Sequence, residues 1–192
     1  MIEAVLAEVE RLLRGVAAAA PFVADWPVGG LRRGCAAETL PVCRWLGQLD
    51  RDVPLVAAVM AAAEHLAWRQ TYGAADLRGA ADFGAAFLRG YGWSEFIGLR
   101  GPVPSTELAC GVLLLAPGVV YPPHAHQAAE VYLPLSGTAE WQLGDGGFVP
   151  VPPGSVISHA PWVPHAMRAG PEPMLALYLW RGGDLAAKSV IL

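Results

Sequence analysis

The chain has 192 residues, of which 54% are hydrophobic and 16% are charged. This length can bury one sizeable core, and so apolar a composition excludes a disordered chain. The net charge is −4 and basic residues do not cluster, so nucleic acid is not an expected partner. No apolar run reaches the roughly 18 residues that a membrane-spanning helix needs.

The cysteines and the first residues bear on cellular location. Cys35, Cys43 and Cys110 are odd in number and show no CxxC spacing, which favours free thiols in a reducing compartment over a disulfide framework. The opening residues, 1–4, include an acid where a secretory signal would carry lysine or arginine. The sequence therefore predicts a soluble, cytoplasmic protein.

The first half of the chain, to about residue 93, has a helical texture. Apolar residues of the segment 2–16 recur at three- and four-residue steps, which is typical of an amphipathic helix. Prolines and glycines between residues 21 and 30 interrupt the pattern. A second helix is expected over residues 52–72, with Asp52 as a candidate cap, and a third over residues 76–88.

From Ser105 onward, short apolar runs separated by proline and glycine predict strands. The expected strands are 108–115, 131–135, 139–143, 148–151, 156–159 and 174–180. Short strands at this spacing are typical of a β-sandwich or barrel. We find no internal repeat and no linker. We therefore expect residues 1–104 to form a helical region that is not an independent domain, packed on a β-barrel formed by residues 105–192.

The clearest pattern combines imidazole, carboxylate and glycine at fixed spacing. It runs Gly118, five residues, His124, one residue, His126, three residues, Glu130, six residues, Gly137. Residues i and i+2 of a strand face the same side, so the two histidines can present nitrogens to one point. Imidazole and carboxylate ligands suit a divalent metal that keeps open coordination positions. A fourth candidate ligand, His165, follows a later strand.

This pattern matches the first motif of the cupin superfamily, G(X)5HXH(X)3-4E(X)6G, at every position. The second motif, G(X)5PXG(X)2H(X)3N, keeps Gly154 and His165, whereas Ala160, Trp162 and Ala169 replace its proline, glycine and asparagine. The resemblance implies a mainly β fold, the cupin double-stranded β-helix or jelly-roll barrel, preceded here by helices. The metal ligands that it implies are His124, His126, Glu130 and His165.

A narrower resemblance covers nearly the whole chain. Residues 121–132, YPPHAHQAAEVY, are similar to the cupin-type dimethylsulfoniopropionate (DMSP) lyases, as are LSG at 135–137, PHAM at 164–167 and WRGGD at 180–184. The length and the helical first half fit the DddQ type. The resemblance implies a metal-dependent carbon–sulfur lyase that cleaves DMSP to dimethyl sulfide and acrylate by β-elimination. It also implies one divalent ion (Fe, Zn, Mn, Co or Ni) and no organic cofactor.

Elimination needs a base, and two tyrosines are candidates. Tyr132 shares a strand face with Glu130, so it is the first candidate for the base or for a further metal ligand. Tyr121 is the alternative base or a clamp for the substrate carboxylate. Aromatic faces attract a sulfonium group, which makes Trp162 and Trp180 candidate substrate contacts.

Several alternatives stay open at this point. His159 could support a ligand, contact substrate or serve the fold alone. The same ligands would serve an Fe(II)-dependent cupin dioxygenase, and a non-catalytic cupin could bind a small carboxylate. The expected partner is a small zwitterionic sulfonium compound, with neither nucleic acid nor membrane, and a homodimer is compatible with the pattern.

Overall fold

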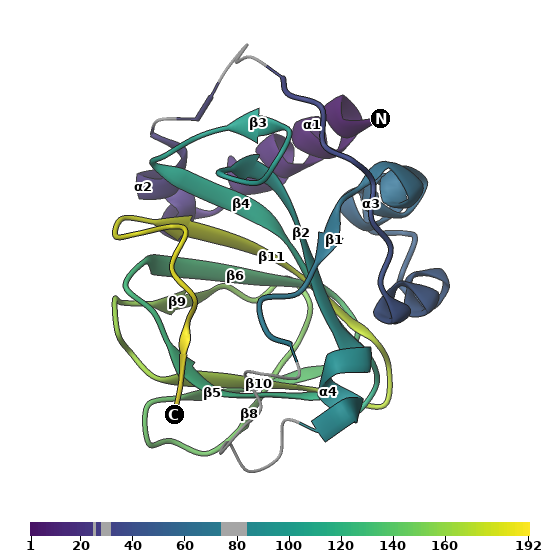
Figure 1. Cartoon of the computed structure of the whole chain (residues 1–192). Helices are drawn as coiled ribbons and strands as arrows, with labels where there is room; N and C mark the ends of the chain where they lie inside the picture. The colour runs from purple at the N-terminus through teal and green to yellow at the C-terminus, as the bar shows by residue number, and fades with distance from the viewer. Residues whose placement is uncertain (25, 28–31, 74–83) are drawn as a thin grey trace.

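The computed structural model of the chain describes residues 1–24, 26–27, 32–73 and 84–192. Two antiparallel-rich sheets face each other, with most of the helical residues outside the upper sheet in Figure 1. One sheet has seven strands in the order β1-β2-β4-β11-β6-β9, with β3 paired to β2. The other has five strands in the order β12-β5-β10-β7-β8.

The strands are β1 (Trp68–Arg69), β2 (Tyr91–Gly98), β3 (Val103–Pro104), β4 (Leu108–Leu115), β5 (Val120–Ala125), β6 (Ala129–Ser136), β7 (Ala139–Leu143), β8 (Val149–Val151), β9 (Ile157–His159), β10 (His165–Ala169), β11 (Met174–Arg181) and β12 (Val190–Ile191). The α-helices are α1 (Ile2–Leu13), α2 (Ala20–Val23), α3 (Pro54–Ala62) and α4 (Gly84–Gly90). Short 3₁₀ helices cover Ala17–Ala19, Pro41–Gln48 and Ala63–His65.

Alternate residues of the seven-stranded sheet belong to two different cores. On β4, Leu108, Val112 and Leu114 pack with helices α1 and α3 in the outer core. Leu113 and Leu115 of the same strand face the space between the sheets. Both faces of β4 are therefore buried, which explains why its sequence is apolar throughout and does not alternate with polar residues.

The first half is less helical than its texture predicted. The helix expected over residues 52–72 ends at Ala62, and Val53, not Asp52, is its N-cap residue. The chain then forms β1, where Trp68 is fully buried and pairs with Ser94 of β2. Pairing with a distant strand has overridden local propensity here. Of the helix expected over residues 76–88, residues 76–83 lie outside the described part of the chain.

Strands β1, β2 and β3 precede residue 105 but belong to the seven-stranded sheet. The sequence pattern missed all three, and it therefore placed the start of the β structure too late. In the described part of the chain, no helix is long and apolar enough to cross a membrane. The three cysteines are free thiols, of which only Cys110 is buried.

Candidate metal centre and the adjoining cavity

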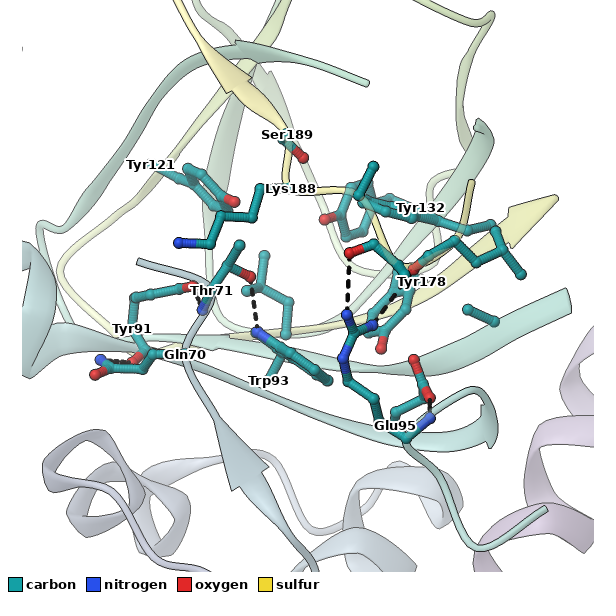
Figure 2. Close-up of a pocket in the computed structure, with 17 residues that line it drawn as sticks. Gln70, Thr71, Tyr91, Trp93, Glu95, Tyr121, Tyr132, Tyr178, Lys188 and Ser189 are labelled. Carbon is teal, nitrogen blue, oxygen red and sulfur yellow. Dashed lines mark hydrogen bonds between the residues drawn. The ribbon is translucent and has the colours of Figure 1, made fainter. Parts of the chain in front are cut away.

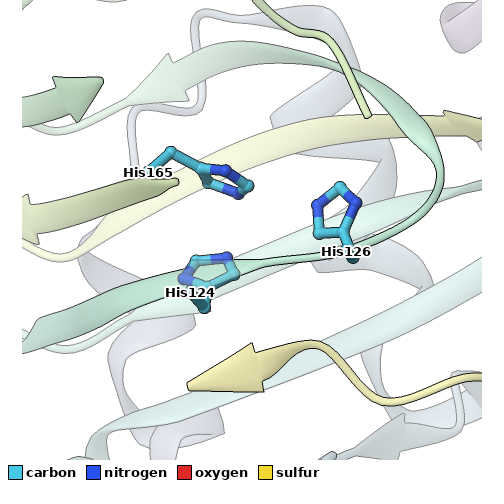
Figure 3. A group of neighbouring side chains, drawn as sticks. All are labelled: His124, His126 and His165. Atoms are coloured by element: carbon cyan, nitrogen blue, oxygen red, sulfur yellow. The ribbon is translucent and has the colours of Figure 1, made fainter. Parts of the chain in front are cut away.

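Strands of both sheets bring four histidines and a glutamate into two buried groups that share His165, one with His124 and His126 and the other with Glu130 and His159. His165 on β10 pairs with His124 on β5, and His126 follows the end of β5. Glu130 on β6 pairs with His159 on β9. Each of these five side chains is at most 4% exposed. We call these five residues the ligand cluster; Figure 3 shows three of its imidazoles turned toward one another.

Backbone carbonyl groups set the tautomer of three imidazoles. The Nδ1 atoms of His124, His126 and His165 lie 2.8, 2.9 and 2.9 Å from the carbonyl oxygens of residues 122, 128 and 163. A carbonyl oxygen can only accept, so Nδ1 carries the hydrogen in each ring. The lone pair therefore lies on Nε2, the atom available to a metal. Such a hydrogen bond at the other ring nitrogen is usual for histidine ligands.

Two of these lone pairs face a carboxylate oxygen. Nε2 of His126 lies 3.1 Å from Oε2 of Glu130, and Nε2 of His165 lies 3.2 Å from the same oxygen. Acceptors facing acceptors are unfavourable unless a cation or a proton lies between them. Two ligands bound to one ion at about 2.1 Å each lie about 3 to 3.4 Å apart. The donor types, the tautomers and the spacing therefore fit one divalent metal.

The electrostatics of the ligand cluster keep Glu130 ionised and His124 neutral. Burial would raise the pKa of Glu130, but a proton held between it and Nε2 of His126, together with the hydrogen bond that His159 donates, outweighs burial, and the pKa lies well below its usual range. Burial, helped by the nearby His165, lowers the pKa of His124 well below its usual value. A metal-binding histidine must be neutral and a metal-binding carboxylate ionised, so both shifts favour metal binding.

His159 is the residue that sequence reasoning left open. Its Nδ1 donates to Oε2 of Glu130 at 2.9 Å, and its ring stacks on His165 with centroids 3.8 Å apart. Its Nε2 is buried and has no hydrogen-bond partner among the described residues. The contact with Glu130 joins residues 29 positions apart, so no local spacing could have revealed it.

A cavity of about 270 Å³ (Figure 2) is lined by residues that contact the ligand cluster, although none of the five cluster residues lines it. Tyr121, Tyr132 and Trp180, the residues that the sequence suggested for the base and the sulfonium contact, line it. Trp180 Nε1 donates to Oε1 of Glu130, and its ring lies 4.2 Å from that of His126, centroid to centroid. Sequence reasoning missed the remaining wall, which comes from β2, β4, the residue pair 70–71, Arg100, Tyr178 and the C-terminal segment 185–189.

The two candidate bases are buried and neutral. Burial raises the pKa of Tyr132 well above its usual value, and the charge of Glu130 raises it further. Burial also raises the pKa of Tyr121, whose hydroxyl donates to the Tyr72 hydroxyl at 3.4 Å. Either phenol needs a compensating positive charge before it can act as a base near neutral pH.

Trp162 is not brought to the cavity. Its side chain is 56% exposed, so the structure does not support the predicted substrate contact. The residue has a φ of 62°, the only positive φ outside glycine in the described residues, and its N–H donates to the carbonyl of His126 at 2.8 Å. Trp162 occupies the glycine position of the second motif. The turn before His165 thus keeps its left-handed residue, and this backbone turns the indole toward solvent.

Facing sheets that bury a histidine and carboxylate cluster between them define this protein as a cupin with a candidate metal centre. The chain belongs to the dimethylsulfoniopropionate lyase family, whose model matches residues 31–176.

Comparison with known proteins supports the same family. DMSP lyase DddQ of Ruegeria pomeroyi is 36% identical over 134 residues, which are 70% of this chain and 63% of that relative. The chain thus spans somewhat less than two thirds of the relative's length. A crystal structure of DddQ from R. pomeroyi DSS-3 matches with a TM-score of 0.86 and 31% identity over 99% of this chain and 95% of the other.

A chain from crystal structures of the DMSP lyases RdDddP and RnDddQII matches with a TM-score of 0.87 and 29% identity, over 100% of this chain and 97% of that one. The cupin fold with N-terminal helices and the DddQ-type resemblance are therefore confirmed.

Proposed function

We propose that this chain is a metal-dependent carbon–sulfur lyase that cleaves DMSP to dimethyl sulfide and acrylate. The observation that carries the proposal is the convergence of oriented Nε2 atoms on Glu130, beside an aromatic cavity. When bound, one divalent ion (Fe, Zn, Mn, Co or Ni) would supply positive charge that holds the substrate carboxylate, acidifies the adjacent C–H and favours a nearby phenolate.

The cavity walls suit the two ends of this substrate. The carboxylate lies at the ligand cluster, and the dimethylsulfonium group lies against the rings of Trp180 and Tyr178. Aromatic faces attract a cation by about 0.5 to 2 kcal/mol, more when water is excluded. Tyr178 is buried and Trp180 half-buried, and the attraction is stronger there than in open water.

Tyr132 is the proposed base. It takes the proton from the carbon next to the carboxylate, the electron pair of that C–H bond forms the new double bond, and the C–S electron pair leaves with sulfur. Because the sulfonium leaves as neutral dimethyl sulfide, no general acid is needed. Tyr121 is the alternative base; its ring stacks on His124 with centroids 4.2 Å apart, and it is otherwise suited to clamp the substrate carboxylate.

The deciding assay is anaerobic. Purified protein loaded in turn with each of the five metals is given DMSP, and dimethyl sulfide and acrylate are measured together. Equal amounts of both products support the lyase. Strict dependence on oxygen would indicate the dioxygenase, and binding of the substrate without any product would indicate a non-catalytic cupin.

Two ligand variants test the metal centre. His126→Ala and His165→Ala each remove one Nε2 atom that faces Glu130, so both should lose bound metal and activity. Elemental analysis of the purified variants measures the first and product release the second. Full metal occupancy in both variants would contradict the assignment of these ligands.

A further inference from the structure

A buried carboxylate lines the cavity and has no part in the proposed chemistry. Glu95 on β2 is 8% exposed. Its Oε1 accepts the backbone N–H groups of Arg100 and Gly101, the latter at 2.9 Å. No hydrogen bond or ion pair within the described residues involves its second oxygen. Burying a carboxylate costs free energy, and the two amide hydrogen bonds and the charges of Arg100 and Arg33 offset it only in part, because the pKa of Glu95 is still raised by burial; packing alone therefore does not account for Glu95.

Glu95 stands at one end of a row of residues that crosses the sheet. Glu95 pairs with Gly111, Gly111 with Tyr178, and Tyr178 with Tyr132. Paired residues face the same side of a sheet. Gly111 has no side chain and so leaves room for the hydroxyl of Tyr178, which would lie 2.7 Å from a Cβ atom at this position. The row therefore forms one cavity wall, from Tyr132 beside the ligand cluster to Glu95 three strands away (Figure 2).

The turn after β2 is shaped around this carboxylate. Gly98 has a φ of 139°, and a Cβ atom at this position would lie 2.7 Å from the carboxyl carbon of Glu95. Burial raises the pKa of Glu95, and the amide hydrogen bond and charge of Arg100 oppose that shift. The side chains of Arg33 and Arg100 donate to backbone carbonyls of residues 98, 101, 185 and 186, so their hydrogen bonds hold them to the loops, while their charges also act on Glu95 and Arg100 itself lines the cavity.

We propose that Glu95 is a specificity-determining residue that selects substrates with a positively charged head group; this inference rests on the proposed function. A substrate anchored by its carboxylate at the ligand cluster extends along the row toward Glu95. Adjacent strands are about 4.8 Å apart, so the backbone of Glu95 lies about 14 Å from that of Tyr132. A propionate with a cationic head is about 5 Å long. The head therefore lies beside Tyr178, and the buried Glu95 attracts it through space.

Two unreactive ligands of equal shape isolate this charge effect. 3-(Trimethylammonio)propionate carries a cationic head, and 4,4-dimethylpentanoate carries the neutral carbon isostere. Affinities for metal-loaded wild type, Glu95→Gln and Glu107→Gln are measured by calorimetry, with metal content as a check. Glutamine keeps an oxygen for the two amides, so the turn should persist. Glu107 is exposed, and its replacement makes the same change in net charge.

Wild type should prefer the cationic ligand. In Glu95→Gln its affinity should fall about five- to tenfold, while affinity for the neutral isostere stays within about twofold; Glu107→Gln should match wild type. The role of Glu95 would be overturned if Glu95→Gln lost affinity for both ligands equally or for neither. It would also be overturned if the wild type did not prefer the cationic ligand. A DMSP assay of wild type separates these results from failure of the proposed function. If wild type releases dimethyl sulfide and acrylate while Glu95→Gln keeps the ligand selectivity of wild type, only the role of Glu95 is rejected.

Discussion

Oε2 of Glu130 lies within 3.2 Å of nitrogens from His126, His159 and His165. Motif spacing predicted Glu130, His126 and His165 as ligands and left His159 open. The roles of the three histidines differ in one respect. His126 and His165 present a lone pair to the oxygen, whereas His159 donates a hydrogen. His159 therefore orients the carboxylate, in the way that outer partners orient metal ligands.

At the residue scale, the first prediction concerns the base. Tyr132→Phe keeps the ring in the cavity wall and removes the proton acceptor. Turnover of DMSP should fall by roughly 10² or more, the usual scale for a general base, with metal content unchanged. Tyr121→Phe, the matched control, should raise KM more than it lowers kcat. Wild-type turnover in Tyr132→Phe with a large loss in Tyr121→Phe would transfer the role to Tyr121.

A second prediction concerns the pH dependence of metal binding. Burial lowers the pKa of His126, but the hydrogen bond that a proton on Nε2 would donate to Glu130, and the charge of Glu130, outweigh it, and the net shift is upward. The metal must displace that proton. Affinity is therefore full above this raised pKa and falls by about tenfold per pH unit as the pH drops below it. Competition with a chromophoric chelator at a series of pH values measures this slope; a flat profile across neutral pH would contradict it.

At the scale of elements, the glycines that frame the first motif have separate structural reasons. Gly118 has a φ of 68° in the turn between β4 and β5. Gly137 has a φ of 80° in the turn between β6 and β7, and a Cβ atom there would overlap the carbonyl oxygen of Pro173. The last glycine of the motif thus allows the turn to pack closely against the start of β11.

Replacement of this glycine should destabilise the fold. Gly137→Ala combines a left-handed backbone with a backbone clash, so the free energy of unfolding should fall by about 2 to 3 kcal/mol. Gly144→Ala is the control, because Gly144 has a φ of 56° and a Cβ atom there would meet open space; it should cost about 1 kcal/mol. Urea unfolding measures both. Equal losses would show that the contact with Pro173 is not the cause.

At the scale of the molecule, the helical first half completes the barrel. β2 pairs with β4 from Tyr91 to Ile97, and α1 and α3 cover the outer face of the same sheet. A fragment of residues 105–192 would expose both the edge of β4 and that apolar face.

We therefore predict that the 105–192 fragment does not fold by itself. Without β2 and the helices, the fragment should aggregate or lack the near-ultraviolet circular dichroism of fixed aromatic side chains, whereas the full chain shows it. A soluble fragment with a cooperative unfolding transition would contradict this and would make the first 104 residues a separable addition.

Sequence alone predicted the features that depend on local spacing. The i, i+2 rule predicted that His124 and His126 meet at one point, which they do although His126 lies just past the end of β5, and short apolar runs located β4 and β7 at their observed bounds. The family resemblance added His165 and the class of reaction.

Tertiary structure alone decided the rest. The pairing of Glu130 with His159, the row that ends at Glu95 and the outward turn of Trp162 all depend on strand register and loop geometry. Local periodicity determines which face of a strand a side chain takes. It contains no information on which distant strand lies opposite, because that choice is made by packing over the whole core.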